Sequence, residues 1–221
     1  MVATTWDALR VVRGEFVRKG LEGGIFIWDN SAPLLTALTG ADSALQTLPL
    51  GHRHLGFLTK DGAQWGGDVS TSDVPAWGET GPVRSDVTGA TTTLGFTGIE
   101  TNRATIELYT GANLEDYVPA VGGEVQIAET DRPSARYWRA LSIAVDMADE
   151  GEVYIGRYLP RAKITDRSGQ NHNDGDDPIS WGGTLTGYRD STAGYAHKWF
   201  FGGPGWASML EGMGFQAAAT A

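Results

Sequence analysis

The chain of 221 residues has 41% hydrophobic side chains and a formal net charge of −10. This composition is typical of a folded protein with one sizeable core. It has no cysteine, which excludes disulfides, thiolate metal sites and cysteine nucleophiles. No cluster of Lys and Arg offers the phosphate neutralisation on which nucleic-acid binding depends. No leader-like or membrane-spanning run is visible, so we expect a soluble protein made in the cytosol.

Residues 1–50 differ in pattern from the rest of the chain and are predicted to form an arm with the first strand. Residues 5–19 favour a short helix or an irregular arm, and the apolar run at residues 25–28 favours a strand. Residues 32–49 are polar and rich in small side chains, so we expect them to order only by packing on neighbouring subunits. On this interpretation, deletion of residues 1–48 would leave a folded core that cannot polymerise.

Residues 51–221 alternate apolar and polar side chains. The whole chain has 31 glycines, which are scattered and mark many turns. Asp61-Gly62 is typical of a hairpin turn. Short helices are expected at residues 113–117, with Asn113 as N-cap, and at residues 206–213. The pattern predicts a mainly β, single-domain sandwich or barrel with one or two short helices. Its strands are expected near residues 67–77, 94–96, 105–109, 125–127, 141–145, 153–159, 179–185 and 195–201.

Few side chains are arranged for chemistry. His52 and His54 would share one face of a strand, but no third ligand of suitable spacing accompanies them. The loop at residues 171–177 is rich in oxygen ligands, yet its acids alternate only in part and the closing Glu of a calcium loop is replaced by Trp181. Both features are more often structural, and we predict no metal, no cofactor and no catalytic residue.

Several segments, in their order, resemble the major tail tube proteins of long-tailed, siphovirus-type bacteriophages, especially those of actinobacteria. The resemblance extends over most of residues 51–206 and is weak over the first 45. Its segments are GHRHLGFLTKDG (51–62), VPAWGETGPVRSDVT (74–88), FTGIETNRATIELYTG (96–111), GEVYIGRYLPRAKIT (151–165), ISWGGTLTGYRD (179–190) and GGPGW (202–206). The third of these is expected to form a strand and a turn that leads into a second strand.

This resemblance implies a two-sheet β-sandwich or barrel with extended arms, in a structural virion protein that is not an enzyme. Its subunits would form stacked hexameric rings around a tape-measure protein, with the tail terminator and baseplate proteins as further partners. DNA would pass through the tube without specific binding. An acidic bore would repel that DNA, and Glu107, Glu124 and Glu152, interpreted as strand residues, are the candidate lumen-facing acids.

Two other classes of protein remain open from the sequence. A glycan-binding β-sandwich module would place several of Trp65, Trp77, Trp138 and Trp181 on an exposed platform. A jelly-roll glycosidase would need two convergent carboxylates, which need not be close in sequence.

Overall fold

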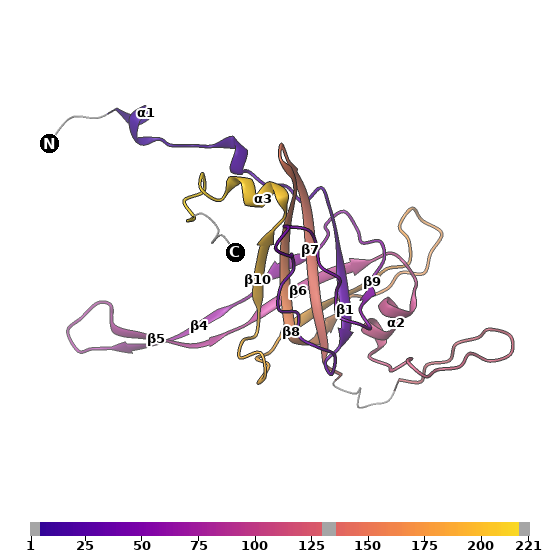
Figure 1. The fold of residues 1–221 in the computed structure, drawn as a ribbon. Helices are drawn as coiled ribbons and strands as arrows, with labels where there is room; N and C mark the ends of the chain where they lie inside the picture. The colour runs from indigo at the N-terminus through magenta and orange to yellow at the C-terminus, as the bar shows by residue number, and fades with distance from the viewer. Residues whose placement is uncertain (1–4, 130–135, 217–221) are drawn as a thin grey trace.

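The computed structural model describes residues 5–129 and 136–216 and shows an antiparallel, mainly β protein (Figure 1). The prediction of the fold class is therefore confirmed. The strands are β1 (Glu22–Asp29), β2 (Arg53–His54), β3 (Gln64–Gly66), β4 (Val69–Pro75), β5 (Pro82–Ala90), β6 (Thr92–Gly98), β7 (Trp138–Ala148), β8 (Gly151–Arg167), β9 (Trp181–Gly187) and β10 (Lys198–Gly202). The helices are α1 (Trp6–Leu9), α2 (Arg103–Thr110) and α3 (Pro204–Met209), with a 3₁₀ turn, η1, at Gly14–Phe16.

Eight strands form one sheet in the order β2-β1-β7-β8-β9-β6-β3, and β10 pairs with β8. β8 is the longest strand, with 17 residues. Its first half pairs with β10, from Tyr154 to Tyr158, and its second half pairs with β9, from Ala162 to Arg167. β8 therefore pairs with two different strands in succession along its length, first β10 and then β9. The remaining strands, β4 and β5, pair only with each other.

Both faces of this sheet carry a hydrophobic core, as the alternation along its strands requires. In β7, Trp138 and Ala140 point to one face and Leu141 and Ile143 to the other. The first core also contains Leu55, Leu94, Leu108, Leu159 and Leu185, so that α2 covers it. The second contains Trp28, Tyr158 and Phe200.

The second core is closed by residues 32–49, which corrects the expectation that this segment cannot bury itself on its own chain. Leu35 and Leu38 are 5% and 3% exposed and pack on Tyr158 and Phe200. The backbone N–H of Leu35 also lies 3.5 Å from the Tyr158 hydroxyl. A few leucines at the right positions are sufficient to dock an otherwise polar segment. The average composition of the segment does not reveal these positions.

Residues 105–109 are helical, so the strand predicted there is wrong. Asn102 caps α2, because its side chain accepts from the Thr105 N–H at 3.0 Å while the Thr105 hydroxyl accepts from the Asn102 N–H. Gly111 ends the helix with a left-handed φ of 75°. These signals at both ends outweigh a brief alternation between them.

Three smaller expectations are also corrected. Residues 125–127 form no strand, and residues 113–117 form a turn in which Asn113 accepts from the Glu115 N–H. Asp61-Gly62 does turn the chain, but the strands on either side pair with β1 and β6 and not with each other. The predicted helix at residues 206–213 is present in part, as α3.

Candidate assembly surfaces

The β4–β5 hairpin projects from the body of the protein as a long two-stranded ribbon (Figure 1). Every residue of both strands is exposed, including Val69, Val74, Val83 and Val87. Trp77, in the connecting turn, is fully exposed. A two-stranded hairpin is at best marginally stable in water without a surface to pack on. Exposed apolar side chains on such a ribbon point to burial against another molecule.

The ribbon is also acidic. Residues 69–90 contain three acids, Asp73, Glu79 and Asp86, and one basic residue, Arg84. Arg84 forms its ion pair with Asp86, at 2.7 Å. Asp73 and Glu79 make no ion pair with any residue in the described part of the chain. The ribbon therefore presents apolar surface together with uncompensated negative charge.

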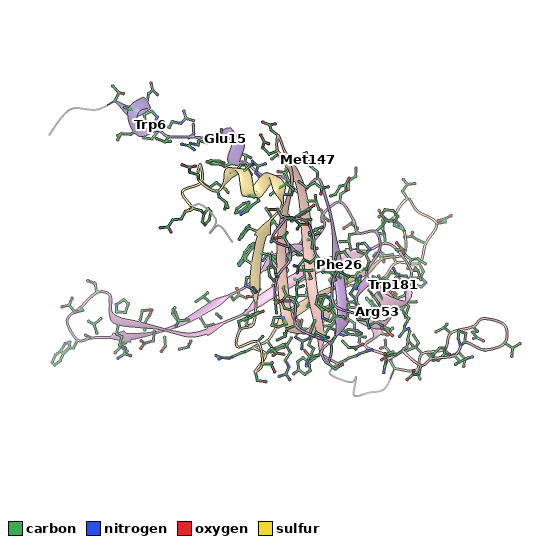
Figure 2. All side chains as sticks on the ribbon, viewed as in Figure 1. Trp6, Glu15, Phe26, Arg53, Met147 and Trp181 are labelled. Atoms are coloured by element: carbon green, nitrogen blue, oxygen red, sulfur yellow. The ribbon has the colours of Figure 1, made fainter. Side chains whose placement is uncertain are left out.

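The N-terminal segment, residues 5–19, is a second element that leaves the body, and Trp6 lies well away from the sheet (Figure 2). Most of its large apolar side chains are exposed, with Trp6 72%, Val11 78% and Val12 69% accessible. The segment contains four basic and two acidic side chains. It is thus an apolar and basic arm on an acidic protein.

Asp146 near the end of β7 fixes the base of this arm. Its carboxylate accepts from the Lys19 backbone N–H at 3.1 Å and lies 3.4 Å from the Arg18 guanidinium. The Lys19 N–H bond, with a smaller effect from Arg18, lowers the pKa of Asp146. The Arg13 guanidinium further donates to the Gly212 carbonyl at 2.9 Å. The arm therefore leaves from a fixed point.

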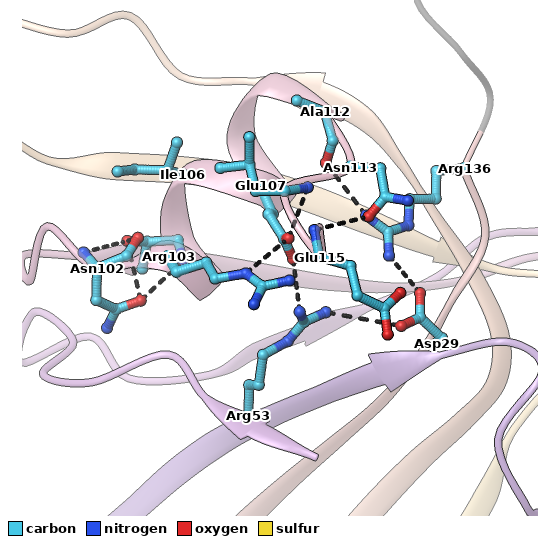
Figure 3. A network of polar contacts seen from close by, with 12 residues as sticks. Asp29, Arg53, Asn102, Arg103, Ile106, Glu107, Ala112, Asn113, Glu115 and Arg136 are labelled. Carbon is cyan, nitrogen blue, oxygen red and sulfur yellow. Dashed lines mark hydrogen bonds and ion pairs between the residues drawn. The ribbon is translucent and has the colours of Figure 1, made fainter. Parts of the chain in front are cut away.

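Glu107 lies on α2 at the centre of a polar network, and its side chain has no exposed surface (Figure 3). Its Oε1 accepts from the Arg103 Nε at 3.0 Å and from the Leu114 N–H at 2.9 Å. Its Oε2 lies 2.8 Å from Arg53 Nη1 and accepts no hydrogen bond within the part of the chain that the structure describes. The Arg53 contact is therefore a close ion pair.

The network continues to the end of β1. Asp29 pairs with Arg136 and lies 4.0 Å from Arg53, and Arg136 also donates to the Ala112 carbonyl at 3.2 Å. This arrangement fixes α2 and the loop after it to the sheet. A side chain without exposed surface cannot line a bore, so the structure contradicts the lumen-facing expectation for Glu107.

Glu124 and Glu152 are both exposed. Glu124 lies in a loop and not on a strand, whereas Glu152 lies at the start of β8, opposite Met147. The Tyr154 hydroxyl donates to the Glu152 carboxylate, which, with burial and the negative charge, raises the pKa of Tyr154 to about 12. These two acids remain candidates for a lumen.

The histidine pair and the acidic loop acquire no metal-binding geometry. The His54 Nδ1 accepts from the Gly56 N–H at 3.0 Å, and its ring packs edge-on against Phe26. His52 Nδ1 contacts the Pro49 carbonyl instead. Among residues 5–129 and 136–216, no three His, Asp or Glu side chains are grouped so as to hold a metal ion.

The four tryptophans expected on a glycan platform do not come together. Trp138 is 1% exposed and lies in the first core, while Trp77 is at the hairpin turn. Trp181 packs edge-on against Tyr109, 5.5 Å between ring centroids. Trp65 lies in a different aromatic group.

That group is an aromatic ladder, formed by Trp65, His197, Trp199, Phe201 and Trp206 in successive ring contacts of 5.0–5.7 Å. Arg157 lies between two of its rings, with its Cζ 4.0 Å from the centroid of Trp65 and 3.8 Å from that of Trp199. Sequence reasoning assigned His197, Trp199 and Phe201 to a strand and Trp206 to a short helix, but it did not identify the ladder. The alternation of His197, Trp199 and Phe201 was the available signal, since it places three rings on one face.

In the described ranges, no helix is both long enough and apolar enough to cross a membrane. The model of a family described as phage tail tube protein matches residues 17–199. No curated protein matches the chain.

Two solved structures are similar at low sequence identity. One is a chain from the virion of a native gene transfer agent particle, 12% identical, covering 74% of this chain and 98% of that one, with a TM-score of 0.34. The other is a crystal structure of an Hcp protein, 9% identical, covering 80% of this chain and 96% of that one, with a TM-score of 0.33.

Proposed function

Because the chain belongs to the phage tail tube protein family, as the match over residues 17–199 shows, we propose that it is the structural subunit of a siphovirus-type tail tube. Its copies would form hexameric rings, and the rings would stack into a hollow tube through which DNA passes. The protein would be made in the host cytoplasm and would work by self-assembly and not by catalysis. Tape-measure, tail terminator and baseplate proteins would be its further partners.

The observation that carries the assembly proposal is the β4–β5 hairpin. Its valines and Trp77 are exposed in the single chain, and neither strand pairs with the large sheet. Burial of apolar surface contributes roughly 25 cal/mol per Å², so docking of this ribbon on a neighbour would stabilise both ribbon and assembly. When one surface of a chain binds a different surface of the next copy, the same contact can repeat from copy to copy. The copies close into a ring or extend into a filament according to the rotation that relates one copy to the next.

The net charge supports the role as a conduit. Each chain carries −10, and like charge on a wall repels phosphate within a Debye length of about 8 Å at physiological ionic strength. Glu124 and Glu152 are the exposed acids proposed to face the bore. The ring size and the further partners follow from the family resemblance.

Negative-stain electron microscopy of the purified protein at rising concentration tests this proposal. Rings or tubes with a central channel are expected for the full chain, and none for a variant in which residues 69–90 are replaced by a short Gly-Ser turn. Discrete monomers at all concentrations, or tubes with a channel lined mainly by Lys and Arg, would contradict the proposed function.

A further inference from the structure

The sheet face that carries the first core does not stay closed along its whole length. Beyond Ala140 and Leu159, the same face continues through Ser142, Ala144 and Ile155 into an open groove of about 750 Å³. Gly20, Gly23 and Gly56 also line this groove. Small residues leave room above the strands, so the groove is shaped to accept side chains from outside.

The aromatic ladder borders this groove, because Trp65 of the ladder lines it, as does Arg157, which lies against two of the ladder's rings. Trp199 and Phe201 are 47% and 48% exposed, and their rings stack at 5.6 Å with an angle of 7°. Large aromatic rings on a sheet face are more often buried, and those next to a groove are typical of the centre of an interface.

Arg157 is the unusual member of this surface. In the described ranges, no carboxylate lies within ion-pair distance of its guanidinium. Its Nε donates to His197 Nε2 at 3.3 Å, and burial lowers the pKa of Arg157. Burial, followed by the charge of Arg157, also lowers the pKa of His197. A cation held between two indoles without a counter-ion favours an acid supplied from elsewhere.

We infer that this groove and ladder, centred on Arg157, are the docking site for the β4–β5 hairpin of a second copy of the chain. The inference rests on the proposed self-assembly and names the surface that receives the ribbon. At Arg157 the charges match, since the hairpin offers Asp73 and Glu79 without ion pairs and this guanidinium has none. The rest of the groove lining is mixed in charge, with one further cation, Lys60, and two acids, Glu22 and Asp61. Apolar surface is present on both sides as well, because Trp77 and the hairpin valines are exposed in the single chain, as are the rings of Trp199 and Phe201 beside the groove.

The first experiment compares two charge reversals by light scattering and electron microscopy. Arg157→Glu is expected to raise the concentration needed for assembly at least tenfold, because it places a carboxylate where the acidic hairpin docks. Arg189→Glu is the matched control, since Arg189 is exposed, lies outside the groove, and its reversal changes the net charge equally. Thermal unfolding of both variants shows whether the body remains folded.

The second experiment does not depend on the folding of Arg157→Glu. The chain has no cysteine, so Trp77→Cys protein mixed with Phe201→Cys protein can be treated with a short bis-maleimide without background. A covalent heterodimer is expected, and none when Val121→Cys, in an exposed turn outside the groove, replaces Phe201→Cys.

The outcomes separate the inference from the proposed function. Suppose that the unmodified chain assembles. If the Trp77→Cys and Phe201→Cys proteins then fail to cross-link, or if Arg157→Glu and Arg189→Glu assemble equally well, the docking site is overturned and the proposed tube is not. Binding of polysaccharide at the ladder, abolished by Arg157→Glu while assembly is unchanged, would overturn it in favour of a glycan site. Failure of the unmodified chain to assemble would remove the proposed function and the docking site with it.

Discussion

Replacement of Glu107 by Gln tests the polar network that fixes α2 to the sheet. The amide keeps the shape of the carboxylate and an oxygen that can accept from the Leu114 N–H, but it removes the negative charge facing Arg53 and Arg103. Removal of one partner from a buried ion pair costs about 3–5 kcal/mol, because the other charge is left without compensation.

The lower end of that range applies here. Arg53 keeps Asp29 at 4.0 Å, and the Arg103 side chain is 45% exposed and can turn to solvent. We therefore expect Glu107→Gln to lower the free energy of unfolding by about 3 kcal/mol. For a chain of this size, 1 kcal/mol shifts Tm by about 2–4 °C, so Tm should fall by roughly 6–12 °C.

Differential scanning calorimetry measures this change, with Arg103→Ala as the matched control. That substitution removes only the half-exposed i,i+4 contact, worth about 0.5 kcal/mol, and should shift Tm by about 1–2 °C. If Glu107→Gln unfolds within 2 °C of the unmodified protein, or if Arg103→Ala has the larger effect, the network does not hold α2 in the way described.

Three further expectations concern other parts of the chain. Leu38→Ala should destabilise the protein by about 2–5 kcal/mol in urea unfolding, because Leu38 is 3% exposed in the second core. Deletion of residues 1–48 removes Leu38 and the whole of β1, so it should abolish cooperative unfolding, and a folded truncation would contradict this account. Tyr154 has a pKa raised from 10.0 to about 12, so the folded state holds the phenolic proton more tightly than the unfolded state, and this contribution to stability is complete below pH 10 and is lost as pH rises towards 12. The Tm of the unmodified protein should therefore fall more steeply between pH 10 and 12 than the Tm of Tyr154→Phe, and parallel curves for the two proteins would contradict this. Trp77→Ala should have a Tm within about 2 °C of that of the unmodified protein, because the ring is fully exposed in the single chain, yet it should need a higher concentration to assemble. If light scattering shows that the variant assembles as readily as the unmodified protein, Trp77 lies outside the interface.

The sequence alone was sufficient to predict the long central strands of the sheet. Alternation at residues 141–145 and 153–159 predicted β7 and β8, because a strand with one face in a core must repeat every two residues. It failed at residues 105–109, where Asn102 and Gly111 were the better signals, together with Arg103 and Glu107 one helical turn apart.

Long-range contacts are decided by the tertiary structure alone. Nothing local in the sequence shows that Glu107 meets Arg53, or that Leu38 covers Tyr158, because the two members of each pair come from segments that lie far apart in the chain. The same holds for the candidate docking site, where Trp65 from β3 and Trp199 from β10 enclose Arg157 from β8. Local pattern reports which side chains share a face of one element, whereas the neighbours of that face depend on how the whole sheet curves and pairs.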